Sequence, residues 1–293
     1  MPLFRRSDGT VVSGLSLVRR IIPFLMRGRN ESVVYYEQML DLTKALPFIE
    51  RWNATATQKI TVFHLIMAAA GKGLIARPGL NRFVSGGRIY QRKGAWISFA
   101  AKQRFADSAA LVTVKIEMKK GEALAQTIER IHGAVGEGRS DKQRPVDKEL
   151  KLLFMVPHFV LGWLVGIMRL LDRWNLMPAS LIANDPMYTS LFVANLGSVG
   201  IDRATHHLYE HGTCSLFCAI GVTKKIVAVD AAGAPVVKDT VSLRFAFDER
   251  INDGYYCAAS LDVLRRYVED PELFLTEPDP GEERSPRVRA SAI

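Results

Sequence analysis

The C-terminal third of the chain carries the clearest alternation of hydrophobic and polar positions. Residues 241–247 place Val, Leu, Phe and Phe at every second position, which predicts a half-buried β-strand. Residues 248–254 are polar and end in Asp-Gly, so they predict a turn. Apolar residues then return at helical spacing over 255–268. The pattern therefore predicts a strand, an acid-rich turn and a closing helix, on which reactive side chains can be mounted.

The same patterning predicts elements along the rest of the chain. Strands are expected at 33–41, 88–91, 95–101, 110–117, 216–221 and 226–229, with a hairpin turn at 233–235. Helices are expected at 16–27, 43–49, 60–76 and 121–135. The polar, Gly-rich stretch 136–147 is predicted to be a loop, and the Pro-rich tail 276–293 is predicted to be disordered.

Residues 152–168 form an apolar run interrupted by Pro157, His158 and two glycines, and flanked by basic residues. The run is just short of the about 20 residues that span a membrane. It fits a buried helix or one covering an apolar groove or oligomer contact, and it also fits a helix lying in one membrane leaflet, with Trp163 and Trp174 at the interface. A spanning helix is the least favoured interpretation, because it would place the two halves of the chain on opposite sides of the bilayer.

The N-terminal region is basic and amphipathic. Residues 3–29 contain six arginines, and residues 16–27 alone predict a basic helix that could lie on a membrane surface. Pro23 inside this helix predicts a kink or a late helix start. The first residues are too polar, and the apolar part is too interrupted, for a signal peptide.

Composition narrows the function classes. With 293 residues, 48% of them hydrophobic, the chain can bury a large core as one domain or two. Cys214, Cys218 and Cys257 fit neither a disulfide framework nor a zinc site, which favours a reducing cytoplasm. The net charge of +9 favours acidic partners such as phosphates or anionic lipids. Nucleic-acid binding is disfavoured, because no nucleic-acid motif accompanies the charge.

The histidines are weak candidates for chemistry. His64, in the helix 60–76, is interpreted as a packed or hydrogen-bonded core residue rather than a base. His207 and His211 would lie four residues apart on one face if 201–211 were helical, with His206 nearby, which is an alternative metal site. No further ligands are apparent, so no metal is expected.

The turn at 248–254 reads Asp-Glu-Arg-Ile-Asn-Asp-Gly, and residues 269–275 read Glu-Asp-Pro-Glu-Leu-Phe-Leu. This block resembles the C-terminal signature of the catalytic domain of 2-oxoacid dehydrogenase acyltransferases (the E2 components), whose fold is shared with chloramphenicol acetyltransferase. That family has Asp-His-Arg-x-x-Asp-Gly before the helix and Glu-x-Pro-x-x-Leu after it. Glu249 stands where the family has its catalytic histidine.

A second block, residues 191–200, reads Leu-Phe-Val-Ala-Asn-Leu-Gly-Ser-Val-Gly and resembles the family's Thr-Ile-Ser-Asn-Leu-Gly. The family's serine donates a hydrogen bond to the oxyanion, and Ala194 stands at its position without a side-chain donor. The resemblance implies that Asn195 and Gly197 shape the strand end beside the substrate channel. Ser198, four residues further on, is an alternative hydroxyl donor.

Weaker matches extend the resemblance over about 14–275, with 136–188 as a linker plus an apolar helical insertion. They lie at residues 16–26, 41–43 and 78–81. The resemblance implies an α/β, two-layer sandwich of the chloramphenicol acetyltransferase and E2 catalytic domain type, formed by one acyltransferase-like domain over 1–275 and assembled as a homotrimer with clefts between subunits. It also implies that Asp253 orients the loop by an ion pair with Arg19 or Arg20, and that Gly254 gives the turn backbone freedom.

The family transfers an acyl group between coenzyme A and a dihydrolipoyl thiol, which its histidine deprotonates. A thiol with a pKa of about 8.5 lies about four units above glutamate but only two above histidine, so proton transfer to Glu249 costs roughly 3 kcal/mol more. Burial of Glu249 would reduce this difference. Loss of a general base costs about 10²–10⁴-fold in rate, and loss of an oxyanion donor about 10²–10³-fold.

Two hypotheses follow. The favoured one is a catalytically inactive homologue that serves as an oligomeric structural or binding scaffold, with membrane-surface contact through 152–168 or the N-terminal helix. The alternative is an active coenzyme A-dependent acyltransferase with altered chemistry that uses Glu249. No lipoyl domain precedes the fold in this sequence, and the charged tail after Leu275 is expected to hinder assembly beyond a trimer.

Overall fold

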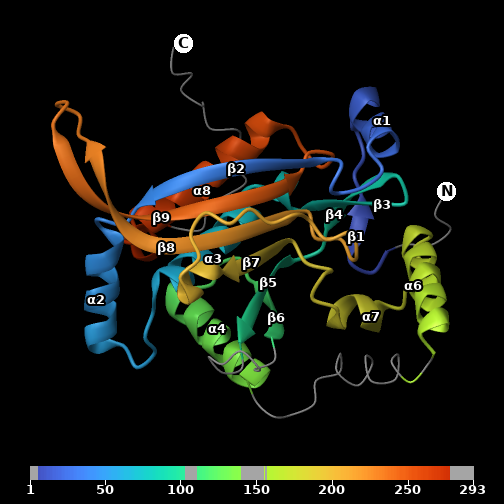
Figure 1. Cartoon of the computed structure of the whole chain (residues 1–293), viewed down its shortest axis with the longest axis horizontal. Coiled ribbons are helices and arrows are strands. Elements are labelled where there is room, and N and C mark those ends of the chain that lie inside the picture. Colours follow the sequence, from blue (N-terminus) through green and yellow to red (C-terminus); the bar gives the residue numbers. More distant parts are fainter. Residues whose placement is uncertain (1–5, 103–110, 140–154, 156, 278–293) are drawn as a thin grey trace.

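The structure of the protein is a computed structural model that describes residues 6–102, 111–139, 155 and 157–277. Its centre is a six-stranded mixed sheet with strand order β2-β9-β8-β7-β5-β6 (Figure 1). The strands are β2 (Val33–Asp41), β5 (Ala95–Lys102), β6 (Leu111–Met118), β7 (Leu191–Asn195), β8 (Leu216–Val229) and β9 (Pro235–Asp248). Strand β7 runs parallel to both of its neighbours, and all other pairs are antiparallel.

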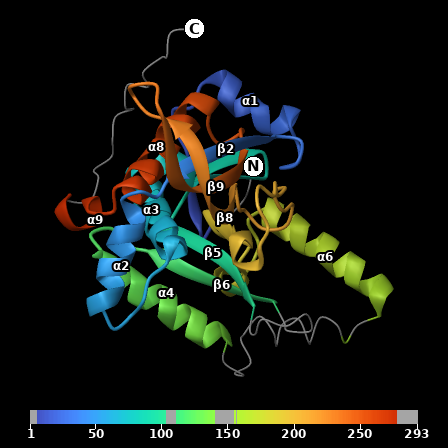
Figure 2. The same ribbon diagram turned by 60° about the vertical axis from the view of Figure 1, so that its left-hand side comes forward.

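One face of this sheet is covered by helices, and Figure 2 shows α2, α3 and α4 together on one side of β5 and β6. The helical layer comprises α2 (Ala45–Thr55), α3 (Val62–Ala76), α4 (Leu124–Arg139), α8 (Gly254–Glu269) and α9 (Leu273–Thr276). The alternation in β9 explains the layering: Leu243 and Phe245 point into the helix-covered core, while Ala246 packs in a second cluster on the opposite face. The expected two-layer α/β arrangement is therefore present.

A second, three-stranded sheet lies beside the main one, with order β1-β4-β3. Its strands are β1 (Gly9–Val11), β3 (Arg82–Ser85) and β4 (Arg88–Arg92), and it neighbours α1 (Leu17–Leu25) and the short η1 (Pro78–Asn81). Of these three strands, the sequence pattern predicted only β4. Strands β1 and β3 have three and four residues, too few for a clear alternation.

The turn between β3 and β4 requires glycine twice. Gly86 and Gly87 have φ of 54° and 75°, which are left-handed values that side chains disfavour. A Cβ on Gly87 would lie 2.8 Å from the ring of Phe24, and one on Gly86 would overlap the carbonyl oxygen of Arg173. The turn thus lies directly against α1 on one side and the end of α6 (His158–Arg173) on the other.

Several predicted boundaries are wrong. The strands expected at 216–221 and 226–229 are the single strand β8, with a register irregularity between Ile220 and Thr223. Strand β9 begins at Pro235 instead of 241, because the two strands continue as a hairpin beyond the core, where exposed valines and lysines break the core pattern. Helix α4 continues to Arg139, so 136–139 are helical and not loop, and α2 runs to Thr55 instead of 49.

The apolar run 152–168 is only partly described, since residues 152–154 and 156 lie outside the described residues. Helix α6 extends five residues past the run, to Arg173, and is followed by α7 (Ala179–Asn184), which was not predicted. Met168 and Leu171 of α6 pack on a small cluster of Met177, Ile182 and Tyr188. Trp163 is 76% exposed, so a fully buried helix is a wrong interpretation.

Within the described ranges, the structure contains no helix with the length and apolar character needed to cross a membrane. The predicted disordered tail lies outside the described residues from 278 onwards, and Thr276 is the last residue of α9. Helix α1 begins at Leu17, capped by the Ser16 hydroxyl oxygen, which accepts from the Arg19 amide at 3.2 Å. Pro23 lies inside the helix and is buried, so the late-start alternative is wrong.

Candidate active site

The loop at the end of β9 is built on a buried ion pair. Asp248 is fully buried and accepts from Arg250 through both guanidinium nitrogens Nε and Nη2 at 2.8 Å, and from the Arg250 amide at 3.1 Å. The Ser32 hydroxyl donates to the same carboxylate at 3.1 Å. Arg250 also donates to the carbonyl oxygens of Met26 and Arg27, each at 3.0 Å. The loop is therefore tied by charge-assisted bonds to Ser32, just before β2, and to the segment after α1.

Glu249 lies between these two residues, and its backbone carries the structural contacts. Its amide donates to the Ser32 carbonyl at 3.0 Å, and its carbonyl accepts from Arg19 at 2.8 Å. The side chain belongs to a half-exposed residue and makes no hydrogen bond or ion pair with the part of the chain that the structure describes. The Glu249 carboxyl is thus presented by the loop without being used to hold it.

Asp253 makes two contacts, and the ion pair expected for it is the weaker of them. It is the N-cap of α8, where its carboxylate accepts from the Tyr256 amide at 2.8 Å. Its other oxygen lies 3.9 Å from Arg19 Nη2, so Arg19 is the partner among the two arginines considered. Because the Asp253 side chain is 63% exposed, this ion pair is weak. Arg19 therefore holds the loop mainly through its bond to the Glu249 carbonyl.

The second motif lies at the end of β7 and continues as η2 (Leu196–Val199). Ala194 packs on the face of the sheet opposite the main helices, against Phe192, Phe217 and Ala219. The hydroxyl of Ser198 is exposed and donates to the Asn195 carbonyl at 2.7 Å. A Cβ on Gly197 would overlap the carbonyl oxygen of Gly221 in β8. This turn therefore depends on a close backbone approach, and it presents no free hydroxyl at position 194.

The two motifs do not meet within one chain. Ala194 lies opposite Ala219 of β8, which lies opposite Arg244 of β9, and Glu249 follows five residues later. Ala194 and Glu249 are thus separated by two spacings between strands and, at right angles to these, by five residues along a strand. This corresponds to a distance of about 19 Å. A reaction that used both positions would need the Ala194 position of one subunit and the Glu249 position of another.

The histidines and cysteines lie apart from these motifs. His64 completes a capping box at the start of α3 and stacks on His132 at 4.7 Å; burial and then the neighbouring His132 lower its pKa to about 4. His64 is thus a packed residue, as interpreted. Residues 201–211 are not helical, so the i,i+4 arrangement of His207 and His211 is wrong, and within the described ranges no three His, Cys, Asp or Glu residues cluster to hold a metal ion.

Several of the arginines that contribute to the net positive charge are buried and have a structural role. Arg6, Arg29, Arg92 and Arg250 are each at most 6% exposed. Burial lowers the pKa of Arg29, and Asp248 partly offsets this effect. Arg29 donates to the carbonyl oxygens of Tyr209, Glu210 and Gly212. The sequence signals for these roles were weak, since only Arg250 lies inside a motif.

Comparison with known proteins agrees with the fold. Residues 179–276 match the family model of the 2-oxoacid dehydrogenases acyltransferase (catalytic domain). A probable dihydrolipoamide acetyltransferase from Listeria monocytogenes has a similar structure, with TM-score 0.60 and 16% identity over 94% of this chain and 98% of that chain. A search of the curated proteins by sequence finds no match.

Two further solved structures are similar. The dihydrolipoamide acetyltransferase of Azotobacter vinelandii gives TM-score 0.53 and 16% identity over 90% of this chain and 94% of that chain. A chloramphenicol acetyltransferase gives TM-score 0.53 and 10% identity over 92% and 100%. The fold is therefore that of the E2 catalytic domain and of chloramphenicol acetyltransferase, and the resemblance drawn from the two motifs is confirmed.

Proposed function

We propose that this protein is an E2-like acyltransferase-fold scaffold that has lost acyl transfer and acts as an oligomeric structural or binding protein. The observation that carries the proposal is at the end of β7. Ala194 has only a methyl group where the family has a hydrogen-bond donor, and the Ser198 proton is engaged by the Asn195 carbonyl. A tetrahedral oxyanion at this place would lack its side-chain donor.

The position of Glu249 supports the same proposal. In the Azotobacter vinelandii enzyme, a serine, a histidine and an asparagine have been investigated for their role in the catalytic mechanism, and that histidine and asparagine are four residues apart. Glu249 and Asp253 have the same separation here. This spacing supports Glu249 as the counterpart of the histidine, with Asp253 as an orienting residue. A carboxylate is the weaker base toward a thiol, as the difference in ordinary pKa values requires.

We further propose a homotrimer, formed by one acyltransferase-like domain over 1–275. The hairpin of β8 and β9 projects from the sheet and exposes Val227, Val229 and Val237, by 72%, 71% and 61%. Val227 lies opposite Val237 in register, so the valines form one apolar stripe. Such a stripe is typical of a protein interface. A reducing, cytoplasmic location is supported by three free, buried cysteines.

The alternative is an active coenzyme A-dependent acyltransferase in which Glu249 is the base. One observation favours it: the loop that presents Glu249 remains tied by Asp248, Arg250 and Arg19, while the Glu249 carboxyl has no described partner. In this alternative Asn195, Gly197 and Ser198 at the end of β7 would border the acyl-thioester of a neighbouring subunit. No metal is required.

The test is acetyl transfer from acetyl-coenzyme A to dihydrolipoamide by the purified protein. We expect no transfer by the wild type and measurable transfer by the double variant Glu249→His, Ala194→Ser, because the added base contributes about 10²–10⁴-fold and the added donor about 10²–10³-fold, not independently. Single variants serve as matched controls. Transfer by the wild type that is lost in Glu249→Gln would overturn the scaffold proposal and establish the alternative.

A further inference from the structure

Helix α1 exposes a continuous apolar face. Leu17, Val18, Ile21, Phe24 and Leu25 are between 49% and 79% exposed. Their spacing of i, i+1, i+4, i+7 and i+8 places them on one side of the helix. Arg20, within this segment, and Arg27, just after it, are also exposed. The apolar face therefore has basic side chains beside it.

Helix α6 has a second exposed apolar stripe. It consists of Trp163, Ile167, Leu170 and the C-cap residue Trp174, which are between 39% and 76% exposed and follow i, i+4, i+7 and i+11. The opposite side of the helix packs on the small cluster described above. Tryptophan at the edge of an exposed apolar helix face is typical of a membrane interface, where one end of the ring is apolar and the other wet.

The two helices border one cavity of about 760 Å³. Five arginines line it against two carboxylates, Asp172 and Glu210. The arginines are Arg27, Arg29, Arg169, Arg173 and Arg250. Arg27, Arg169 and Arg173 are exposed, and their side chains have no carboxylate partner within the described ranges. The cavity between the two apolar stripes therefore has unneutralised positive charge, suited to an anion.

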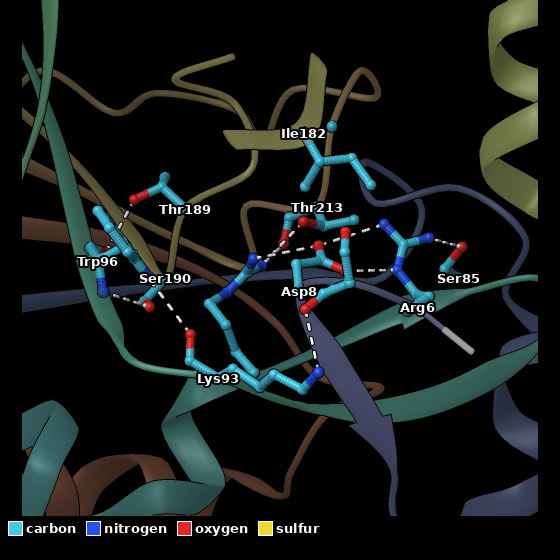
Figure 3. A network of polar contacts seen from close by, with 12 residues as sticks. Arg6, Asp8, Ser85, Lys93, Trp96, Ile182, Thr189, Ser190 and Thr213 are labelled. Carbon is cyan, nitrogen blue, oxygen red and sulfur yellow. Dashed lines mark hydrogen bonds and ion pairs between the residues drawn. The ribbon is translucent and has the colours of Figure 1, made fainter. Parts of the chain in front are cut away.

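The C-terminal end of α6 is held firmly by a buried polar network. Arg6 donates to Asp8 at 2.7 Å and to Ser85 at 2.9 Å, as Figure 3 shows. The Arg6 guanidinium also pairs with Asp172 of α6 at 2.9 Å and donates to its carbonyl at 3.2 Å. Because Arg6 is only 4% exposed, this pair neutralises Asp172 inside the protein. Helix α6 is thus fixed to the three-stranded sheet, and the side of the helix that carries Trp163 remains exposed.

We propose that the face formed by α1 and α6 docks on a membrane surface rich in anionic phospholipid. The two apolar stripes lie in the interfacial region, and the arginines between them bind lipid phosphates. The proposal rests on the helical spacing of the exposed apolar residues, the tryptophans and the charge of the cavity. It is independent of whether Glu249 is a working base.

A second copy of this chain fits the face less well. A symmetric contact of this face with itself would bring Arg27, Arg169 and Arg173 of both copies together. The valine stripe on the β8–β9 hairpin, at the other end of the molecule in Figure 1, offers an apolar surface for oligomer contacts without such a charge cluster. An anionic bilayer instead places a negatively charged phosphate opposite each exposed arginine.

The experiment is co-sedimentation of the full chain with vesicles of phosphatidylcholine alone and of phosphatidylcholine with phosphatidylglycerol. We expect binding only to the acidic vesicles, weakened by added salt. The double variant Arg169→Gln, Arg173→Gln should bind about 30-fold more weakly, from about 1 kcal/mol for each basic residue near the surface. Removal of the same charge elsewhere, by Lys119→Gln with Lys120→Gln, should have no effect, because both lysines are exposed in the segment between β6 and α4 and do not line this cavity.

The apolar contribution is tested by single variants. Leu17→Ser and Leu170→Ser should each weaken binding about tenfold. Leu275→Ser, on α9 and as exposed as Leu170 (59% against 55%), should not. Equal binding to neutral vesicles, or equal binding by all variants, would overturn the proposal. So would loss of the oligomer in Leu170→Ser, which would assign the face to a second copy. If the protein binds inorganic phosphate at these arginines but does not bind vesicles, the proposal is also overturned, and the ligand is a soluble anion.

Discussion

The two motif segments are held in place by opposite means. The loop at 248–254 is fixed by charged side chains, with Asp248 and Arg250 paired in the interior. The turn at 194–200 is fixed by the lack of a side chain, because Gly197 lies directly against the backbone of Gly221. In neither segment does the side chain at the proposed catalytic position, Glu249 or Ala194, make a hydrogen bond or ion pair within the described residues. The scaffold of such a site can therefore persist after the reactive groups have been replaced.

The largest effect is expected in the charged loop. Arg250→Met should destabilise the protein by about 3–5 kcal/mol, because it leaves the Asp248 carboxylate buried without its bidentate partner. The free energy of unfolding in urea measures this. The double variant Asp248→Asn, Arg250→Met should cost less than the single one, since no charge is then stranded. A double variant that costs the sum of both single variants would show that the pair is not the main support of the loop.

The turn at 194–200 should be nearly as sensitive, for a steric reason. Gly197→Ala should cost about 1–3 kcal/mol, because the added methyl group would force the strand end away from β8. Gly133→Ala is the matched control: no atom lies within 4 Å of the added methyl, so it should stabilise helix α4 by about 0.5–1 kcal/mol. The comparison between the segments fails if both alanine variants unfold at the same denaturant concentration.

A smaller effect is expected for Arg19→Gln, which removes the charged bond to the Glu249 carbonyl and the weak pair with Asp253. We expect a loss of about 1 kcal/mol. Arg20 is the next residue and its side chain is exposed, so Arg20→Gln should change the free energy of unfolding by no more than about 0.5 kcal/mol. Thermal unfolding of the two variants side by side decides whether Arg19 braces the loop.

The smallest change in stability is expected when the two proposed catalytic positions are replaced together. Glu249→His with Ala194→Ser should change stability by no more than about 0.5 kcal/mol, because neither side chain has a structural bond in the described ranges. Calorimetric unfolding of the double variant measures it. A loss of several kcal/mol would mean that one of these positions supports the fold, and a failed activity test with that variant would then say nothing about chemistry.

Much of the fold follows from the sequence, and the errors have a common cause. The alternation in 241–247 and the helical spacing in 255–268 both correspond to elements of the structure, since each buries one face against a core. The short strands β1 and β3 and the outer half of the β8–β9 hairpin were missed or misplaced. Those segments lie at the edge of the core or beyond it, so burial does not impose a pattern on them.

The sequence also identified Glu249, Ala194 and Asp253 as positions of interest through the two motifs. It proposed Arg19 or Arg20 as a partner of Asp253, and the ion pair in the structure is with Arg19. It did not reveal that the motifs lie on separate strands about 19 Å apart. Spacing along the chain does not specify strand order. The partner strand β8, which comes between them, is supplied by residues between the two motifs.

Hydrophobic periodicity and turn residues act locally, so they were enough to predict most strands, most helices and the two motif turns. The layered α/β fold was predicted through the family resemblance that the two motifs carry. Which charged side chains are buried and which are exposed depends on the three-dimensional arrangement of the chain. Arg6, Arg29 and Arg250 are buried with hydrogen-bond acceptors from distant segments: Asp172 pairs with Arg6, and backbone carbonyl oxygens accept from Arg29 and Arg250. Arg169 and Arg173 remain exposed beside α1 because no such acceptor faces them in the described part of the chain. An arginine's surroundings, unlike its charge, depend on residues far away in the chain.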